Sequence, residues 1–443
     1  MWEKLRSIWT VPDLRKKILF TLGILLVFRV LAHINVPLNA AEQKALSGLV
    51  NSNSSGGIGQ LLGLMDVFSG GSLQSFSIVS FSVYPYITAT IVMQLLQPII
   101  PALQNLSAQG ESGRLRFSQI TRIIAVPLAF LQALGQAALF QQEQVLTNFN
   151  LFSSQYALQS WGILFSLVAG TMILVWLGEL ITEKGIGNGI SIIILANILS
   201  NLPKYVSQGV TAAQSGGGQA VVSIGVFLII GVITIIGIVY IYLGQRRVPV
   251  QYPTKRSVGR GMLVGSAQTT YIPMQINSAG MIPLIFASSM LLFPTVIVRY
   301  LSTSSVAWIK DTSLWISLYV INTNDWWYWA INFLLVVAFT YFYAYVMWQQ
   351  QNIPENLQKQ GAFIPGYRPG EPTSRYLFNI LNRITLAGAL FLGLVTILPF
   401  IARVGGNQLL SAASLLIAVG VVLDTVRQLE SQMVMRNYSG FLS

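Results

Sequence analysis

Ionisable side chains are scarce in the apolar stretches of this chain, and this scarcity limits the chemistry that it can perform. The sequence has no cysteine and a single histidine, His33, which excludes a disulfide framework, a thiol nucleophile and a Cys/His metal cluster. Arg29 is the one charge deep within an apolar stretch, whereas Glu179, Glu183 and Asp424 lie near the ends of such stretches. We therefore predict no catalytic residue, no cofactor and no metal site.

Three features near these residues have structural explanations. Arg29 either ties helices together through backbone carbonyls or contributes to the electrostatics of a pore. His33 has no second His or Cys with which to complete a metal site and is interpreted as an interfacial group. The run Gly185-Ile-Gly-Asn-Gly189 lacks the Lys and Ser/Thr of a phosphate-binding loop, so it indicates a helix break.

Uncharged polar side chains recur in several of the apolar stretches. They are Thr88, Thr90, Gln94, Gln97, Gln132, Gln136, Gln275, Asn277, Ser278, Ser288 and Ser289. Buried amides and hydroxyls bridge helices in lipid with about 0.6 to 2 kcal/mol each, which suits an interface that closes and reopens. Permanent links between helices explain the same spacing equally well.

The elements that position these residues are predicted to be transmembrane helices. Only 9% of the 443 residues are Asp, Glu, Lys or Arg, against about 25% in a soluble domain, and 53% are hydrophobic. Apolar runs of spanning length, about ten in all, indicate an all-α polytopic membrane protein. The runs are roughly 18–34, 77–98, 120–140, 159–178, 190–203, 221–243, 276–298, 327–348, 384–401 and 408–427.

The basic residues predict the orientation of these spans. With the N-terminus inside, about 20 of the 26 Lys and Arg residues fall on the inner side and about 5 on the outer side. Because basic residues accumulate on the cytoplasmic side of a membrane, this split predicts that both termini are cytoplasmic. The expected divisions are an N-terminal segment 1–17, a first half 18–203, an external hinge segment 204–220, a second half 221–427 and a tail 428–443.

Two inner segments, 244–275 and 349–383, are long, basic and rich in Pro and Gly. Loops that only connect spans rarely need this length, so exposed Arg beside aromatic residues suggests a docking surface for an anionic or protein partner. The general basic bias of inner segments is the alternative explanation.

Several long motifs follow one another along the chain. They are Phe68-Ser-Gly-Gly71, Pro85-Tyr-Ile-Thr-Ala89, Gln94-Leu-Leu96, Gly110-Glu-Ser-Gly-Arg114, the run from Gly178 to Ser191, Ala279-Gly-Met-Ile-Pro283, Phe286-Ala-Ser-Ser289 and the run from Gly361 to Gly370. In this order they resemble the SecY family, the channel subunit of the protein-conducting translocon, and the resemblance covers nearly the whole chain.

The resemblance implies ten transmembrane helices in two inverted five-helix halves around a central hourglass pore, with a short plug helix at about 58–71. By position, the pore ring would be Val83, Ile87, Ile190, Ile194, Ile285 and Ile417. The plug residues would be Leu61, Leu62, Leu64, Met65, Val67 and Phe68. The lateral gate, between the second and seventh spans, would carry Thr88, Gln132 and Asn277. Partner docking would use Arg246, Arg247, Lys255, Arg256 and Arg368.

The resemblance further implies a passive channel for preproteins and membrane segments in a bacterial plasma membrane or a thylakoid-type membrane. Expected partners are SecE-like and SecG-like small membrane subunits, a SecA-type motor ATPase, the ribosome, preprotein signal sequences and the lipid bilayer. A secondary transporter would also account for ten spans, but it predicts charges or a coordinated ion at the midplane. An intramembrane enzyme would require paired carboxylates, a Ser/His pair or a metal set at membrane depth.

Overall fold

The structure is a computed structural model, and it describes the chain in segments. These are residues 11–36, 42–46, 66, 69–142, 145–146, 149–215, 217–258, 262–277, 280, 282–302, 306–319, 325–401 and 412–439.

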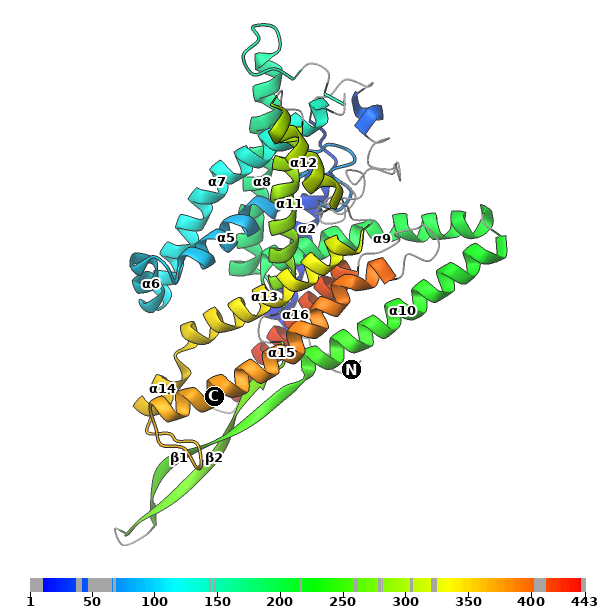
Figure 1. The fold of residues 1–443 in the computed structure, drawn as a ribbon. Helices are drawn as coiled ribbons and strands as arrows, with labels where there is room; N and C mark the ends of the chain where they lie inside the picture. The colour runs from blue at the N-terminus through cyan, green and yellow to red at the C-terminus, as the bar shows by residue number, and fades with distance from the viewer. Residues whose placement is uncertain are drawn as a thin grey trace.

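The described chain is helical apart from one β-hairpin (Figure 1). The helices are α2 (Pro12–Leu31), α5 (Tyr84–Leu96), α6 (Pro101–Ala108), α7 (Glu111–Gln142), α8 (Ala157–Lys184), α9 (Gly189–Ser215), α10 (Gly217–Leu243), α11 (Ile282–Ser302), α12 (Ala307–Tyr319), α13 (Trp326–Gln351), α14 (Ile353–Lys359), α15 (Glu371–Ile401) and α16 (Ala412–Ser439). The strands are β1 (Gln245–Val258) and β2 (Met262–Gln275). Each apolar run predicted as a span overlaps one of these helices.

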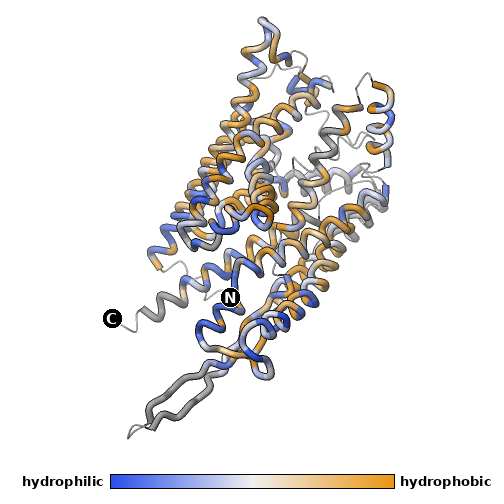
Figure 2. The backbone as a smooth tube through the Cα atoms, turned by 60° about the vertical axis from the view of Figure 1, so that its left-hand side comes forward, coloured by the Kyte–Doolittle hydropathy of each residue, from blue (hydrophilic) through white to orange (hydrophobic). Residues whose placement is uncertain are grey.

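Several helical stretches are long and apolar enough to cross a bilayer. Within the described residues four satisfy both criteria, namely Leu115–Ala138, Ala157–Lys184, Trp326–Lys359 and Glu371–Leu398. Gly189–Pro203 and Ile229–Leu243 are apolar but shorter. Figure 2 shows that hydrophobic residues dominate the middle of the helix assembly, while hydrophilic residues gather at helix ends and beside the hairpin.

The segment 244–275, expected as a loop, is mostly a two-stranded antiparallel hairpin that extends away from the helices (Figure 1). Val248 and Val250 are buried whereas Arg247 and Pro249 are exposed, which is the two-residue alternation of a strand with one covered face. Pro249 is tolerated because a two-stranded sheet leaves one edge of each strand unpaired.

Other boundaries also differ from the sequence expectation. The hinge segment 204–220 is helical in its described residues, because α9 continues to Ser215 and α10 begins at Gly217. Segment 349–383 contains α14 and the first turns of α15. Helix α5 begins at Tyr84 rather than near residue 77, with Pro85 in its first turn, where the missing proline N–H costs no hydrogen bond.

Two apolar cores hold the helices together. One lies where α7 and α8 pack, and small residues at every fourth position of α7 allow their close approach. These residues are Ala129, Ala133 and Ala137. The second, the central cluster, takes residues from α2, α8, α9, α10, α11, α13, α15 and α16, so it joins segments from both ends of the chain.

Candidate functional site

The central cluster contains all six residues predicted to form the pore ring. Val83, Ile194 and Ile417 are buried in it. Ile87, Ile190 and Ile285 are partly buried and pack against it. The six side chains come from the start of α5 and from α9, α11 and α16, so residues more than 300 positions apart share one apolar cluster with many other side chains. The six predicted residues are called the ring below.

The ring residues of α9 are positioned by a tight junction with α8. The carbonyl oxygen of Gly178 lies 1.8 Å from the point where a side chain on Gly189 would begin, so only glycine fits at Gly189. Thr182 Oγ1 donates to the Gly178 carbonyl at 3.0 Å and accepts from the Gly189 N–H at 2.9 Å. Asn188 Oδ1 accepts from the Ile190 N–H at 3.1 Å and caps the new helix.

The predicted plug falls largely outside the described residues. This holds for Leu61, Leu62, Leu64, Met65, Val67 and Phe68, so their assignment stays a prediction. The neighbouring Asp66 is described and buried, and its Oδ1 accepts the Gln74 N–H at 3.1 Å.

The three residues predicted for the lateral gate lie near the packing of α5, α7 and α11. Gln132 Nε2 donates to Thr88 Oγ1 at 3.4 Å, which joins α7 to α5. Asn277 Nδ2 donates to the Gly280 carbonyl at 3.1 Å instead, and no described hydrogen bond links it to Thr88 or Gln132. The buried amide oxygens of Gln132 and Asn277 have no partner in the described part of the chain.

An apolar group fills the α5–α11 seam beside these residues. Phe286 of α11 is buried with Ile91 of α5 and Tyr343 of α13. The ring of Phe286 stands edge-on to Phe339 at 5.9 Å and to Tyr343 at 6.1 Å. These aromatic contacts join α11 to α13, whereas α5 contributes the aliphatic side chain of Ile91 to the cluster.

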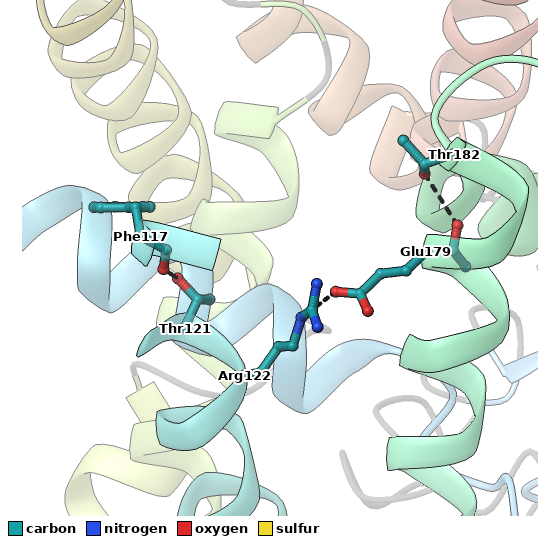
Figure 3. Close-up of polar contacts among 6 residues, drawn as sticks. Phe117, Thr121, Arg122, Glu179 and Thr182 are labelled. Carbon is teal, nitrogen blue, oxygen red and sulfur yellow. Dashed lines mark hydrogen bonds and ion pairs between the residues drawn. The ribbon is translucent and has the colours of Figure 1, made fainter. Parts of the chain in front are cut away.

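An ion pair between α7 and α8 was missed by the sequence reasoning. Arg122 Nε pairs with Glu179 Oε1 beside the α8–α9 junction (Figure 3). The two residues are far apart in sequence, so no helical spacing rule could have found them. Because the Arg122 side chain is 43% exposed and that of Glu179 is 24% exposed, solvent weakens this pair.

Arg29 contacts a backbone carbonyl, as one of its two interpretations proposed. Its Nη1 donates to the Gly70 oxygen at 3.2 Å, which ties α2 to the segment before α5. His33 Nδ1 lies 2.8 Å from the Arg29 carbonyl oxygen and is exposed. Within the described residues no group of three or more His, Asp and Glu side chains is placed to hold a metal ion.

The predicted docking residues belong to two segments that the structure joins. Gln251 of β1 exchanges backbone hydrogen bonds with Phe363, of 2.9 and 3.0 Å. A separate apolar cluster beneath them includes Val248, Ala362 and Ile364. We call β1, β2, α14 and residues 360–370 the hairpin platform.

The basic residues of the hairpin platform are exposed where they are described. Arg246 and Arg247 are exposed at the root of β1, and Arg368 is exposed in the turn between Gly366 and Gly370. Both glycines have positive φ, 89° and 105°, and Thr373 Oγ1 donates to the Arg368 carbonyl at 2.8 Å. Lys255 and Arg256 lie farther along β1, and their side chains are outside the described part.

Fold and site together define a helical, multi-spanning membrane protein whose helices converge on an aliphatic centre and which carries a basic platform outside the helix assembly. The SecY family model matches residues 77–426 of the chain. The chain is 39% identical over 457 aligned positions to the protein translocase subunit SecY of Streptomyces griseus, with 100% of both chains covered. It is 37% identical to SecY of Mycobacterium tuberculosis, with 97% of each covered. The chain belongs to the SecY family.

Solved structures agree with this family at the level of the fold. A structure described as a protein-conducting channel has a TM-score of 0.57 and 17% identity, and the match covers 95% of this chain and 93% of the other. A SecY structure concerned with the plug domain has a TM-score of 0.60 at 16% identity, with 95% and 92% covered. These relationships make the chain an integral membrane protein of the translocase-subunit class.

Proposed function

We propose that this chain is the channel-forming subunit of a protein translocase, a passive pore through which preproteins cross the membrane and from which membrane segments enter the lipid. The single observation that carries this proposal is that the six residues predicted for the ring, although they come from distant helices, all belong to or pack against one apolar cluster. Membership of the SecY family supports the same function.

Aliphatic side chains suit a seal that must also open for many substrates. They offer no hydrogen bond to water or ions, so a narrow ring of them excludes water. They also discriminate little among the side chains of a passing polypeptide, because dispersion contacts are not directional. The ring therefore seals the pore around a translocating polypeptide whatever the sequence of that polypeptide.

The finer architecture is part of the proposal. Ten spans form two inverted five-helix halves around the pore, a plug near residues 58–71 rests beneath the ring, and the lateral gate opens between α5 and α11. Both termini lie in the cytoplasm, and the bacterial origin of the relatives supports the plasma membrane as the location. The chain has no catalytic activity of its own, so the energy for transport comes from a bound partner.

The hairpin platform is the proposed docking surface for that partner. Arginine side chains on a stiff turn make bidentate contacts with carboxylates or RNA phosphates. The proposed partners are a SecA-type motor ATPase and the ribosome, together with SecE-like and SecG-like membrane subunits. A solved Sec61 structure from a canine ribosome–channel complex shares the fold at a TM-score of 0.54, which is consistent with ribosome docking.

Reconstitution tests the function directly. The purified chain and its small subunits are placed in vesicles with a motor ATPase, and uptake of a radiolabelled preprotein is compared with uptake of small solutes. We expect ATP-dependent protection of the preprotein from added protease and no concentrative solute uptake. Concentrative uptake of a solute without preprotein transport would instead identify a secondary transporter.

A further inference from the structure

One face of α9 carries three polar side chains that contact Asp66, Gly70 and Ser82, which precede α5. Asn197, Ser200 and Asn201 are spaced three and four residues apart and so share a face. Asn197 Nδ2 donates to Ser82 Oγ at 2.8 Å. Ser200 Oγ lies 3.0 Å from the Gly70 carbonyl oxygen and 2.8 Å from that of Asn197 in its own helix, so its single proton is shared between them. Asn201 Nδ2 donates to the Asp66 carbonyl at 3.2 Å.

A second helix holds the same segment. Arg29 of α2 donates to the Gly70 carbonyl that Ser200 also contacts, so this oxygen accepts from two helices. Gly70 has a φ of 70°, and a side chain on it would begin 2.7 Å from Asn197 Oδ1. The segment is therefore fitted closely against α9 at this point.

These polar contacts adjoin the ring. Ser82 immediately precedes the ring residue Val83, and Asn197 follows Ile194 by one helical turn. Asn197 is fully buried, with 0% of its surface exposed, yet its Oδ1 has no hydrogen-bond partner in the described part of the chain. Burying this amide costs desolvation free energy, and the one hydrogen bond from Nδ2 only partly offsets that cost. The contact therefore stabilises the packing of Ser82 against α9 only weakly.

We propose that Asn197, Ser200 and Asn201, with Arg29, form a releasable latch that positions residues 69–83, and with them Val83, in the closed seal. The latch proposal rests on the proposed channel function, and it identifies residues that position the closed seal of that channel. The latch must release for the ring to widen, since Val83 can move outward only with the segment to which it is joined. Its weak hydrogen bonds match that requirement, because buried polar contacts between membrane helices contribute little.

A reversible cross-link tests the latch. The chain has no cysteine, so Ser82→Cys combined with Asn197→Cys supplies the only two thiols. We expect an oxidant to form the disulfide in vesicles and to lower preprotein transport about tenfold or more, because the closed state is then held covalently, and a reductant to restore transport. Each single cysteine variant is assayed with and without the same oxidant as a control, and the oxidant should not change its transport rate because no second thiol of the chain is present to form the disulfide.

Each other result counts against the latch. Normal transport by the fully cross-linked protein would mean that the segment stays on α9 while the channel opens. A pair that does not cross-link would contradict the contact itself. If the reduced pair and the unsubstituted chain also fail to transport, the proposed channel function is wrong and the latch falls with it.

A second measurement does not depend on cross-linking. Asn197→Ala with Asn201→Ala should raise resting ion conductance about eightfold, because two hydrogen bonds that favour the closed state are lost. Asn197→Gln with Asn201→Gln keeps both amides and should leak less than the alanine pair. Ser166→Ala is the matched control, because Ser166 Oγ on α8 donates only within its own helix, to the Gly162 carbonyl at 2.7 Å. Unchanged conductance in the alanine pair would overturn the proposal.

Discussion

The ring and the hairpin platform differ in the interactions that form them and in the chemical groups that they present. The ring consists of aliphatic side chains from four distant parts of the chain, and its position depends on how the helices pack. The hairpin platform is held by a continuous backbone ladder from Gln245↔Gln275 to Val258↔Met262 and by a small apolar cluster of its own. The ring offers no directional contact, whereas the hairpin platform presents charged donors on a fixed backbone.

Under the proposed function, the two regions have separate tasks. A surface that must close around any polypeptide gains from having no hydrogen-bonding groups, and a surface that must hold one partner gains from fixed charges. The two regions should therefore fail differently when they are altered. Changes around the ring should affect folding and leak, while changes on the hairpin platform should affect transport alone.

The largest effect is expected at the junction that positions the ring. In Gly189→Ala the new Cβ would lie 1.8 Å from the Gly178 carbonyl, so α8 and α9 must separate. We expect the free energy of unfolding to fall by about 3 kcal/mol, as in overpacked cores, measured by thermal unfolding in detergent. Gly162→Ala on α8, where nothing lies within 4 Å, is the control and should unfold no more readily. Equal stability of both variants would refute the tight junction.

On the hairpin platform, Arg368→Glu should block transport without opening the ring. We expect preprotein transport to fall about tenfold, since a buried or bidentate charge contact contributes more than about 1 kcal/mol. Resting ion conductance and association with small subunits should not change. Lys310→Glu, at an exposed position of α12 predicted to face outside, is the control. Normal motor and ribosome binding by Arg368→Glu would show that the basic residues only set topology.

A smaller effect is expected at the lateral gate. Thr88→Val removes the acceptor for Gln132 Nε2 and should shift the balance between closed and open states by about 1 kcal/mol, or about fivefold. The readout is transport of a preprotein with a weakened signal sequence. Thr90→Val is the matched control on the same helix, because Thr90 Oγ1 donates to the Tyr86 carbonyl of its own helix at 2.9 Å. If Thr88→Val lowers only the abundance of the protein and does not change transport of the preprotein with the weakened signal sequence, Thr88 and Gln132 form a permanent link between helices.

The smallest effect is expected for the Arg122–Glu179 pair. A double-mutant cycle with Arg122→Ala and Glu179→Ala should give a coupling of about 0.5 to 1 kcal/mol in unfolding free energy, because the pair is partly exposed. The more exposed pair Arg375–Glu371 on α15 should give less coupling. Equal coupling free energies at the two sites would mean that the Arg122–Glu179 pair contributes no more to the free energy of unfolding than an exposed surface ion pair does.

Much of the helical organisation could be predicted from the sequence, because apolar runs of spanning length carry a strong signal. The helix starts were less predictable. Residues 77–83 are apolar enough to continue a span, yet Ser82 takes a positive φ of 50° and the helix begins only at Tyr84. Among residues other than glycine, positive φ is enriched at Asn, Asp and His, so a serine in this conformation is not expected from the sequence.

The hairpin and the latch were missed for different physical reasons. The Pro- and Gly-rich sequence of 244–275 is typical of a loop, and the strand alternation of Val248, Val250 and Tyr252 is short. Asn197, Ser200 and Asn201 lie in the shortest predicted span, where polar residues look like a helix end. The ring could be assigned only through the resemblance, because an isoleucine in a core and an isoleucine in a pore look the same in sequence.

Resting ion conductance of ring variants tests the central claim most directly. Single-channel currents are recorded across planar bilayers for Ile87→Ser with Ile417→Ser, and for Ile87→Leu with Ile417→Leu as the apolar control. We predict that the serine pair raises resting conductance about tenfold or more, because hydroxyl groups wet the constriction, and that the leucine pair does not. An assembled serine variant that conducts no more than the unsubstituted channel would contradict the assignment of the central cluster as the seal.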